Sequence, residues 1–183
     1  MRSVIVIRAF GFREIGVAEM PCSIRYCFSQ RFPVSARKAY DWCTDYGAQD
    51  HVLMGDEAAE RQITHIAEDV MILTDIFYVG TGAVEKQKVV QLYPDCLRWV
   101  STHLTGPHKY SQFIYEISAE GEGASRLDFT ALHLEYSENL DSENIKSLAG
   151  RLKEEDSEAW KLLAKAMTKE LASKPKGEIK NKS

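Results

Sequence analysis

Sequence patterns that indicate a metal site or a redox-active cysteine pair are missing from this chain. Its four cysteines, Cys22, Cys27, Cys43 and Cys96, form no C-x-x-C pair, and no histidine stands at metal-ligand spacing from them. Structural zinc sites are usually built from such clusters. We therefore expect reduced cysteines that mainly fill packing positions, and we expect neither a metal nor another cofactor.

Long apolar runs and an excess of basic residues are missing too. The apolar run near the start ends at Arg8, which makes it too short for a secretory signal, and no later run approaches the length that crosses a bilayer. The formal net charge is −4, whereas nucleic acids and anionic membranes select for concentrated Lys and Arg. These absences predict a cytoplasmic protein that neither binds nucleic acid nor inserts into a membrane. They leave its oligomeric state open.

The motifs of several large enzyme classes are also absent. The chain has no G-x-S-x-G, Walker loop, G-x-G-x-x-G or H-E-x-x-H sequence, so no nucleophile, phosphate or zinc chemistry can be assigned from motifs. What is present is an ordinary globular composition, with 44% hydrophobic and 27% charged residues. A length of 183 residues suits one domain with a sizeable core.

Seven segments alternate apolar and polar residues with the two-residue period of a strand. The first covers residues 23–32, and six more follow at 61–67, 70–79, 83–93, 97–104, 110–119 and 125–136. Gly, Pro or Asp residues separate these six segments, and tight turns favour those residue types. The pattern predicts about seven strands, nearly all antiparallel to their neighbours.

Between the first two strand segments the hydrophobic rhythm becomes helical. Residues 36–43 repeat apolar side chains at helical spacing, and Ser35 stands where an N-cap is expected. Gly47 and Gly55 then bracket a second short helical or irregular stretch. We expect two short helices directly after the first strand.

A long amphipathic helix is predicted at residues 142–173, with Asp141 as its N-cap and Leu140 placed for a hydrophobic staple. The residues after it, 174–183, are polar and basic and are expected to form a flexible tail. Residues 1–22 are expected to be an N-terminal extension. The predicted domain is therefore 23–173.

The string FPVSARKAYDW at residues 32–42 resembles the strand-to-helix entry of the START/SRPBCC superfamily. That superfamily includes polyketide cyclases and dehydrases, pollen-allergen-like proteins and lipid-transfer domains. The resemblance covers roughly residues 24–171 and concerns a fold signature, not a catalytic motif. It implies an α+β helix-grip fold, in which a curved antiparallel sheet of about seven strands wraps around the long C-terminal helix. Two short helices close one end, and sheet and helix enclose a cavity.

Tight turns would place directly opposed residues of neighbouring strands on the same face of the sheet. One face then collects most of the large apolar and aromatic side chains, and we assign it to the concave side. Apolar walls with a few polar groups are typical of ligand pockets. The predicted ligand-binding residues, including one from the long helix, are Leu73, Phe77, Lys86, Trp99, Phe113, Tyr115, Phe129 and Trp160.

Polar residues interrupt this apolar face and are the candidate catalytic residues. Asp75 and Lys86 would oppose each other across the turn at 80–82, either to recognise a carbonyl or hydroxyl group or as a weak ion pair at the cavity mouth. His103 and His133 could act as acid or base near neutral pH, or could simply be satisfied by hydrogen bonds. His51, His65 and His108 carry no hypothesis, since His65 is expected on the other face and the remaining two in loops.

The long helix adds one acidic candidate. Its apolar stripe is interrupted by Glu154, Glu155 and Asp156, and either Glu155 or Asp156 should lie near the inward face. Asp156 would neighbour Trp160 on the helix surface. Asp156 could bind or protonate a ligand in the cavity. Alternatively, the middle of the helix rotates or bends so that the acids reach solvent.

Three functions follow from this sequence. The first is binding of a small hydrophobic or amphipathic molecule, such as a lipid, an aromatic or a polyketide-like compound, between sheet and C-terminal helix. The second is a cyclase or dehydratase that uses acid and base groups in that cavity, which requires at least two of the candidates to converge. The third is a protein-interaction module with a vestigial cavity.

Overall fold

The computed structural model describes residues 21–47, 59–79, 81–106, 108–136 and 141–173. Its elements in chain order are β1 (Cys22–Phe32), α1 (Ala36–Thr44), β2 (Ala59–Ala67), β3 (Val70–Val79), β4 (Gly82–Tyr93), the 3-10 turn η1 (Pro94–Cys96), β5 (Arg98–His103), β6 (Gln112–Ala119), β7 (Ser125–Glu135) and α3 (Ser142–Ser173). No helix within these ranges is long and apolar enough to cross a membrane.

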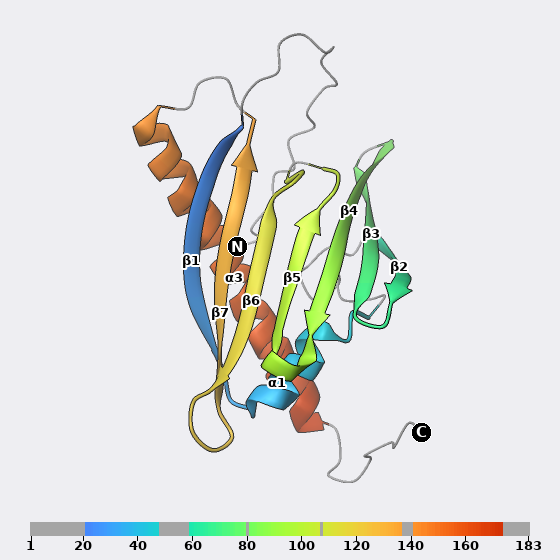
Figure 1. The fold of residues 1–183 in the computed structure, drawn as a ribbon, viewed down its shortest axis with the longest axis vertical. Coiled ribbons are helices and arrows are strands. Elements are labelled where there is room, and N and C mark those ends of the chain that lie inside the picture. Colours follow the sequence, from blue (N-terminus) through green and yellow to red (C-terminus); the bar gives the residue numbers. More distant parts are fainter. Residues whose placement is uncertain (1–20, 48–58, 80, 107, 137–140, 174–183) are drawn as a thin grey trace.

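The strands form one seven-stranded sheet in the order β1-β7-β6-β5-β4-β3-β2, and every neighbouring pair is antiparallel. Six of the strands therefore follow one another as a meander, and β1 joins at the far edge against β7. Figure 1 shows α3 crossing behind the sheet on a diagonal, from the β1 edge toward α1 at the lower end. The predicted α+β architecture, with about seven antiparallel strands and a long C-terminal helix, is confirmed.

The strand boundaries differ from the predicted ones mainly around β5 and β6. Pairing begins at Arg98 instead of residue 97 and at Gln112 instead of residue 110. Leu97 and Tyr110 both have a positive φ, of 50° and 66°. A strand requires negative φ, so these two residues cannot continue the ladder and each acts as a corner before its strand.

The N-cap residues of α1 and α3 differ in their hydrogen bonds. Asp141 Oδ1 accepts hydrogen bonds from the backbone N–H groups of Glu143 and Asn144, at 3.0 and 2.7 Å, which confirms it as the N-cap of α3. Ser35 occupies the N-cap position of α1, but its side chain makes no capping bond. The corner before α1 is instead fastened by Ser125, whose Oγ donates to the carbonyl of Val34 at 2.8 Å.

Several predictions concern residues outside the described ranges. They are the second short helix between Gly47 and Gly55, the staple residue Leu140, most of the extension at 1–22 and the tail at 174–183. The predicted extension ends at residue 22, whereas β1 already begins at Cys22.

Two apolar clusters hold α3 against the sheet. Near its start, Leu152 packs with Ile24, Tyr26 and Phe129 from the strands. Toward its end, the buried residues Ala164 and Met167 belong to a second cluster that also contains residues of α1 and of β3, β4, β5 and β7. Each large apolar side chain removed from water contributes about 1.5–3 kcal/mol. The helix is thus anchored at two places, with Asp156 and Trp160 between them.

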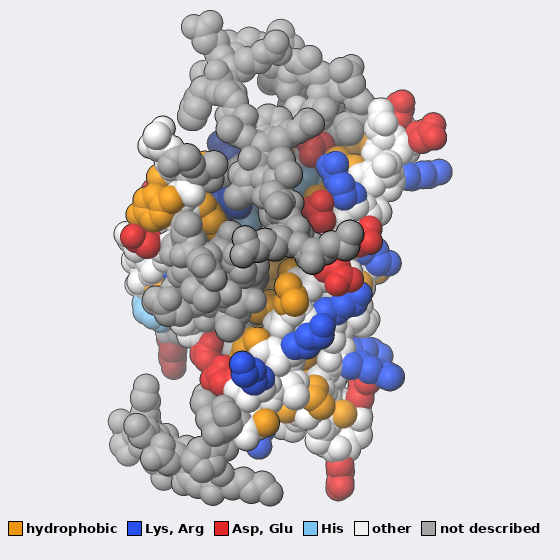
Figure 2. Space-filling model, turned by 180° about the vertical axis from the view of Figure 1, so that it is seen from behind, with side chains coloured by type: hydrophobic (Ala, Val, Ile, Leu, Met, Phe, Trp, Pro, Cys, Tyr) orange, Lys and Arg blue, Asp and Glu red, His pale blue; other side chains and the backbone are white. Residues whose placement is uncertain are grey.

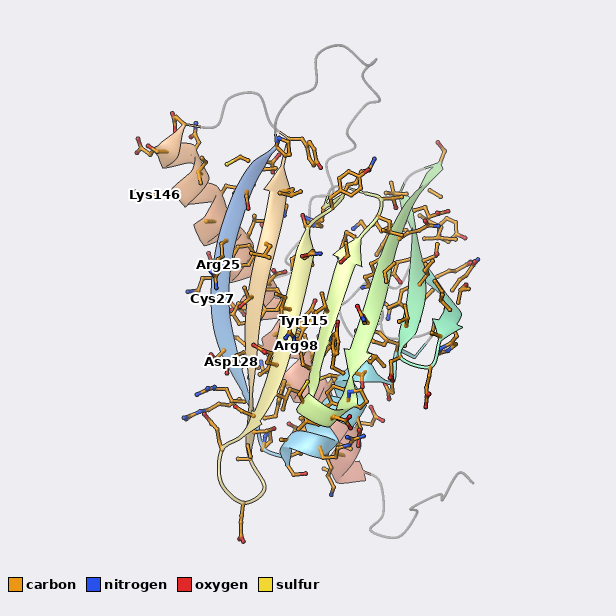
Figure 3. The ribbon with its side chains drawn as sticks, viewed as in Figure 1. Arg25, Cys27, Arg98, Tyr115, Asp128 and Lys146 are labelled. Atoms are coloured by element: carbon orange, nitrogen blue, oxygen red, sulfur yellow. The ribbon has the colours of Figure 1, made fainter. Side chains whose placement is uncertain are left out.

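The registers of β3 to β7 confirm the predicted division into two faces. The ladder aligns Leu92 with Trp99, Trp99 with Tyr115 and Tyr115 with Phe129, all on the face that α3 covers, which we call the inner face. Arg25, Cys27 and Asp128 belong to the outer face, over β1 and β7 in Figure 3.

All four cysteines are free, as expected. The packing role predicted for them does not hold throughout. Cys27 and Cys96 are exposed, whereas Cys22 and Cys43 are half-buried. Cys43 packs against the second apolar cluster, and burial raises the pKa of its thiol.

Candidate functional site

A buried carboxylate with two cationic neighbours lies on the inner face of β2, β3 and β4. Arg61 donates from Nε to Asp75 Oδ1 at 2.6 Å and from Nη2 to Oδ2 at 3.1 Å, and Lys88 Nζ lies 3.6 Å from Oδ2. The Asp75 and Arg61 side chains are 9% and 8% exposed. Burial by itself would raise the pKa of Asp75, but the Arg61 hydrogen bonds and the Lys88 charge hold it below its ordinary value. Asp75 is therefore a fixed anion.

The predicted partner Lys86 does stand opposite Asp75 in the β3–β4 register. Its ammonium, however, lies over the ring of Phe77, with Nζ 4.3 Å from the ring centroid. The ion pairs of Asp75 are made by Arg61 and Lys88 instead. Phe77 and Lys86, both predicted ligand-binding residues, are thus neighbours on the inner face, where a cation–π contact holds the ammonium over an apolar surface.

Three histidines gather where β5, β6 and β7 meet at their upper ends. The His108 ring lies 5.7 Å from that of His103 and 5.2 Å from that of His133, centroid to centroid, and the Nδ1 atoms of His108 and His133 are 3.4 Å apart. His133 also lies near two further polar groups, with Nδ1 at 3.4 Å from Ser111 Oγ and Nε2 at 3.5 Å from Glu135 Oε2. The structure thus brings the candidates His103 and His133 together through His108.

These histidines are uncharged at neutral pH. Burial, reinforced by the charge of Lys88, lowers the pKa of His103 to about 3, and burial with the neighbouring His133 lowers that of His108 to about 4. Burial also lowers the pKa of His133, although Glu135 opposes the shift. General acid–base catalysis is most effective when the pKa lies near the working pH. His103 and His108 are therefore suited to hydrogen bonding with a guest more than to proton transfer.

Asp156 forms a second polar centre, on α3. The hydroxyl of Tyr26, from β1, donates to Asp156 Oδ2 at 2.6 Å. Burial raises the pKa of Asp156 to about 6; the Tyr26 bond acts in the opposite direction and the charge of Glu155 adds to the rise. Burial and the Asp156 charge together raise the pKa of Tyr26. Of the two positions considered from sequence, Asp156 is turned toward the sheet, while Glu155 is exposed.

An aromatic layer lies on the inner face beside the Tyr26–Asp156 pair. Trp99 and Tyr115 stack with ring centroids 4.7 Å apart, Trp160 lies 5.7 Å from Tyr115, and Phe129 lies 5.2 Å from Tyr115. Trp99 is only 2% exposed, whereas Tyr115 and Trp160 are half-buried. The layer forms an apolar surface on the inner face, and its residue Tyr115 is labelled in Figure 3.

The other predicted ligand-binding residues lie in or beside this layer. Leu73 is completely buried, and Phe113 is buried against Phe129 with ring centroids 5.9 Å apart. Leu73, Phe113 and Phe129 are therefore core residues in this structure. The side chains left for contact with a guest are the half-buried ones.

Sequence reasoning missed three residues of these centres. Arg61 was missed because the register shifts by one residue between His65 and Ala67, relative to the register that a tight turn would give. The shift brings Arg61 opposite Asp75 and aligns His65 with Met71 on the inner face. His65 itself is exposed. His108 was assigned to a loop, and Tyr26 was seen only as part of an alternating strand. No sequence signal marks the bulge, but the alternation of β1 already placed Tyr26 on the same side as Ile24.

Two open grooves lined by described residues lie elsewhere on the surface. Both include Arg31 and Pro33; one continues toward Glu120, and the other runs along α3 past Lys161, Lys165 and Lys169. Figure 2 views the molecule from the α3 side and shows basic side chains gathered on the lower half of that face. Neither groove touches a predicted site residue, so we do not assign them to the site.

Comparisons with known proteins identify the fold of this chain through solved structures. No protein-family model matches the chain, and no curated protein matches it in sequence. Among solved structures, the Zhui aromatase/cyclase from Streptomyces sp. R1128 aligns with a TM-score of 0.63 at 9% identity, covering 82% of this chain and 96% of its own. Norcoclaurine synthase from Thalictrum flavum aligns with a TM-score of 0.63 at 12% identity, covering 92% and 98%. A protein from Thermus thermophilus gives 0.56 at 15%, covering 84% and 100%.

The chain has the helix-grip fold of the START/SRPBCC superfamily. At these identities the likeness concerns the fold alone, so no residue role passes from those proteins to this helix-grip chain. Its chemistry has to be read from its own inner face. There, an aromatic layer, the Tyr26–Asp156 pair, neutral histidines and a cation-flanked carboxylate share one face.

Proposed function

We propose that this helix-grip protein binds a small amphipathic molecule against the inner face of its sheet, beside α3. The observation that carries the proposal is the burial of ionisable groups on that face. Asp75 is 7% exposed, and burial has moved the pKa of Lys88, His103 and Asp156 away from their ordinary values. Burying such groups costs free energy unless they gain partners.

The distribution of these groups matches an amphipathic guest. The half-buried rings of Tyr115 and Trp160 offer apolar surface, and polar groups lie on the same face of the sheet. Ligand sites in proteins have this constitution, with apolar walls and a few polar groups that fix orientation. A purely aliphatic molecule would leave those polar groups without new partners, which favours a guest with at least one polar group.

An enzymatic role is the second candidate, and it rests on Asp156 alone. Among the four predicted catalytic residues, Asp156 is the one whose pKa is raised toward neutrality, to about 6, which suits a general acid. Asp75 is a fixed anion, and the pKa of His103 is about 3. Asp156 also bonds to Tyr26 and not to another candidate. A cyclase or dehydratase would therefore have to work with this one acid and a group of the substrate.

The third hypothesis, a protein-interaction module with a vestigial cavity, has less support. It requires a contiguous exposed apolar patch. The large exposed apolar side chains of the described residues are spread over several elements, for example Ile66 at the end of β2, Tyr110 before β6 and Leu162 on α3. Single exposed apolar residues of this kind are normal on protein surfaces.

The proposal is tested by native mass spectrometry of the purified protein, with identification of any co-purified compound, and by titration with a fluorescent hydrophobic probe. Tyr115→Ala removes a half-buried ring from the inner face, and Ile114→Ala is its control, since it removes an apolar side chain from the outer face of the same strand. A lost aromatic contact and its buried area should weaken probe binding roughly tenfold in Tyr115→Ala and leave Ile114→Ala close to the wild type. If the wild type carries no compound and takes up no probe, the proposal fails.

A further inference from the structure

Asp156 differs from two carboxylates of the sheet, the buried Asp75 and the more exposed Asp128, in having no cation beside it. Asp75 is held by Arg61, and Asp128 by Arg126 through a 2.9 Å contact. Throughout the part of the chain that the structure describes, the Asp156 carboxyl has one hydrogen-bond partner, the Tyr26 hydroxyl, and no Lys, Arg or His at ion-pair distance. One of its oxygens is left to accept from something else.

Aromatic rings surround this carboxyl. Tyr26 and Trp160 are its immediate neighbours, Trp160 because it lies one helical turn further along α3. Tyr115 lies 5.7 Å from Trp160, and the charge of Asp156 adds to the burial that raises the pKa of Tyr115; Phe129 lies 6.2 Å from Tyr26. The faces of such rings carry negative electrostatic potential and attract cations, most strongly when water is excluded.

A carboxylate beside aromatic rings is suited to binding an ammonium group. Taking a carboxylate out of water without a counter-charge costs free energy, and a bound cation offsets that cost through a charge-assisted hydrogen bond and contacts with the rings. An anionic guest would meet repulsion at the same place. A neutral hydroxyl would gain a hydrogen bond but not the attraction between opposite charges.

We propose that Asp156, together with the rings of Tyr26, Tyr115 and Trp160, binds a protonated amine of the amphipathic ligand. This inference deepens the proposed function and rests on it. The other polar groups of the inner face do not compete for this role. Arg61 and Lys88 are cations, and their carboxylate partner Asp75 is already engaged by both.

The test compares three ligands with the same eight-carbon chain: octylamine, octanol and octanoate. Each is titrated near pH 7.5 into the wild type, Asp156→Asn and the control Glu154→Gln by displacement of the fluorescent probe, with direct calorimetry as a check. Glu154 is an exposed carboxylate two residues away on α3, so its removal changes the net charge equally without touching the site. We expect octylamine to bind about tenfold or more tightly than octanol, and octanoate most weakly, because a charge-assisted hydrogen bond contributes about 1.5–3 kcal/mol. Asp156→Asn should abolish the preference for the amine and leave octanol binding unchanged, while Glu154→Gln keeps the preference.

Two results would overturn the amine assignment while leaving the proposed function in place. One is equal binding of octylamine and octanol, or tightest binding of octanoate, by the wild type. The other is an amine preference that persists in Asp156→Asn, which would move the recognition elsewhere. Failure of all three ligands to bind the wild type would remove the proposed function and the amine assignment together.

Discussion

Replacing Asp156 by asparagine should stabilise the protein, and the gain should grow with pH. The folded state raises the pKa of Asp156 to about 6, whereas an unfolded aspartate titrates near its ordinary value of 3.8. The folded state therefore holds the proton more tightly. Stability from this group is fully present below the unfolded pKa and is lost as the pH rises through the folded one. Asparagine keeps an acceptor for the Tyr26 hydroxyl but carries no charge.

The pKa difference sets the size of the effect. A shift of about two pH units corresponds to about 3 kcal/mol between the fully protonated and fully ionised forms. Roughly half of that loss has already accumulated at pH 5, because the unfolded carboxyl ionises first. Between pH 5 and pH 8 the advantage of Asp156→Asn over the wild type should therefore increase by about 1.4 kcal/mol.

Urea denaturation of both proteins at the two pH values measures this increase. Titration of the buried histidines affects both proteins equally and cancels in the difference. Glu154→Gln serves as the control and should show no comparable increase, since Glu154 is exposed. An advantage of Asp156→Asn that does not change between pH 5 and pH 8 would show that Asp156 is not held in a shielded environment, and it would remove the basis of the ammonium site.

Three further predictions concern His103, the Arg61–Asp75 pair and the helix N-caps. The folded state lowers the pKa of His103 to about 3, so this residue contributes stability above the unfolded pKa of 6.5 that is lost as the pH falls. In urea titrations between pH 8 and pH 5.5, the unfolding free energy of His103→Gln should therefore fall by about 1.4 kcal/mol less than that of the wild type. Arg61→Leu should lower the unfolding free energy by about 3–5 kcal/mol because it leaves Asp75 buried with a weaker partner. A double-mutant cycle with Asp75→Leu should give a coupling energy above about 1 kcal/mol, and additive losses would contradict the Arg61–Asp75 ion pair. Asp141→Ala should lower the unfolding free energy by about 1 kcal/mol, whereas Ser35→Ala, which loses no capping bond, should change it by a few tenths; equal losses would refute the cap assignment.

The faces of β3 to β7 could be predicted from the sequence, whereas the face of β2 could not. Val79 pairs with Gly82 across the β3–β4 turn, so counting outward from the turn residues gave the correct partners along both strands. The same count failed at the β2–β3 turn. One register shift there changed the face of β2, and with it the partner of Asp75. A bulge depends on local backbone geometry that hydrophobic periodicity does not encode.

The orientation of α3 could not be fixed from the sequence either. The run from Glu154 to Asp156 places three acids in a row, and helical periodicity alone left open which of them faces inward or whether all reach solvent. Packing decides the question. Leu152 and Met167 are buried on the two sides of the run, and the helix rotation that buries both turns Asp156 toward Tyr26. The tertiary contact, not the local pattern, decides which of the three acids faces the sheet.

The two polar centres together restrict how a ligand can lie on the inner face. Tyr26, the partner of Asp156, lies in the ladder row of Ala131, Phe113 and Ser101, and His103 is two residues beyond Ser101 on β5, which corresponds to about 7 Å along the strand. A ligand whose amine contacts Asp156 would therefore have to extend by about that distance along the strands, and also across them, to reach the neutral histidines and Lys88. A shorter guest would touch one centre only, and the ammonium site would then determine its orientation. The separation favours an elongated molecule with an amine at one end, an apolar middle and, where it is long enough, a hydrogen-bonding group at the other end.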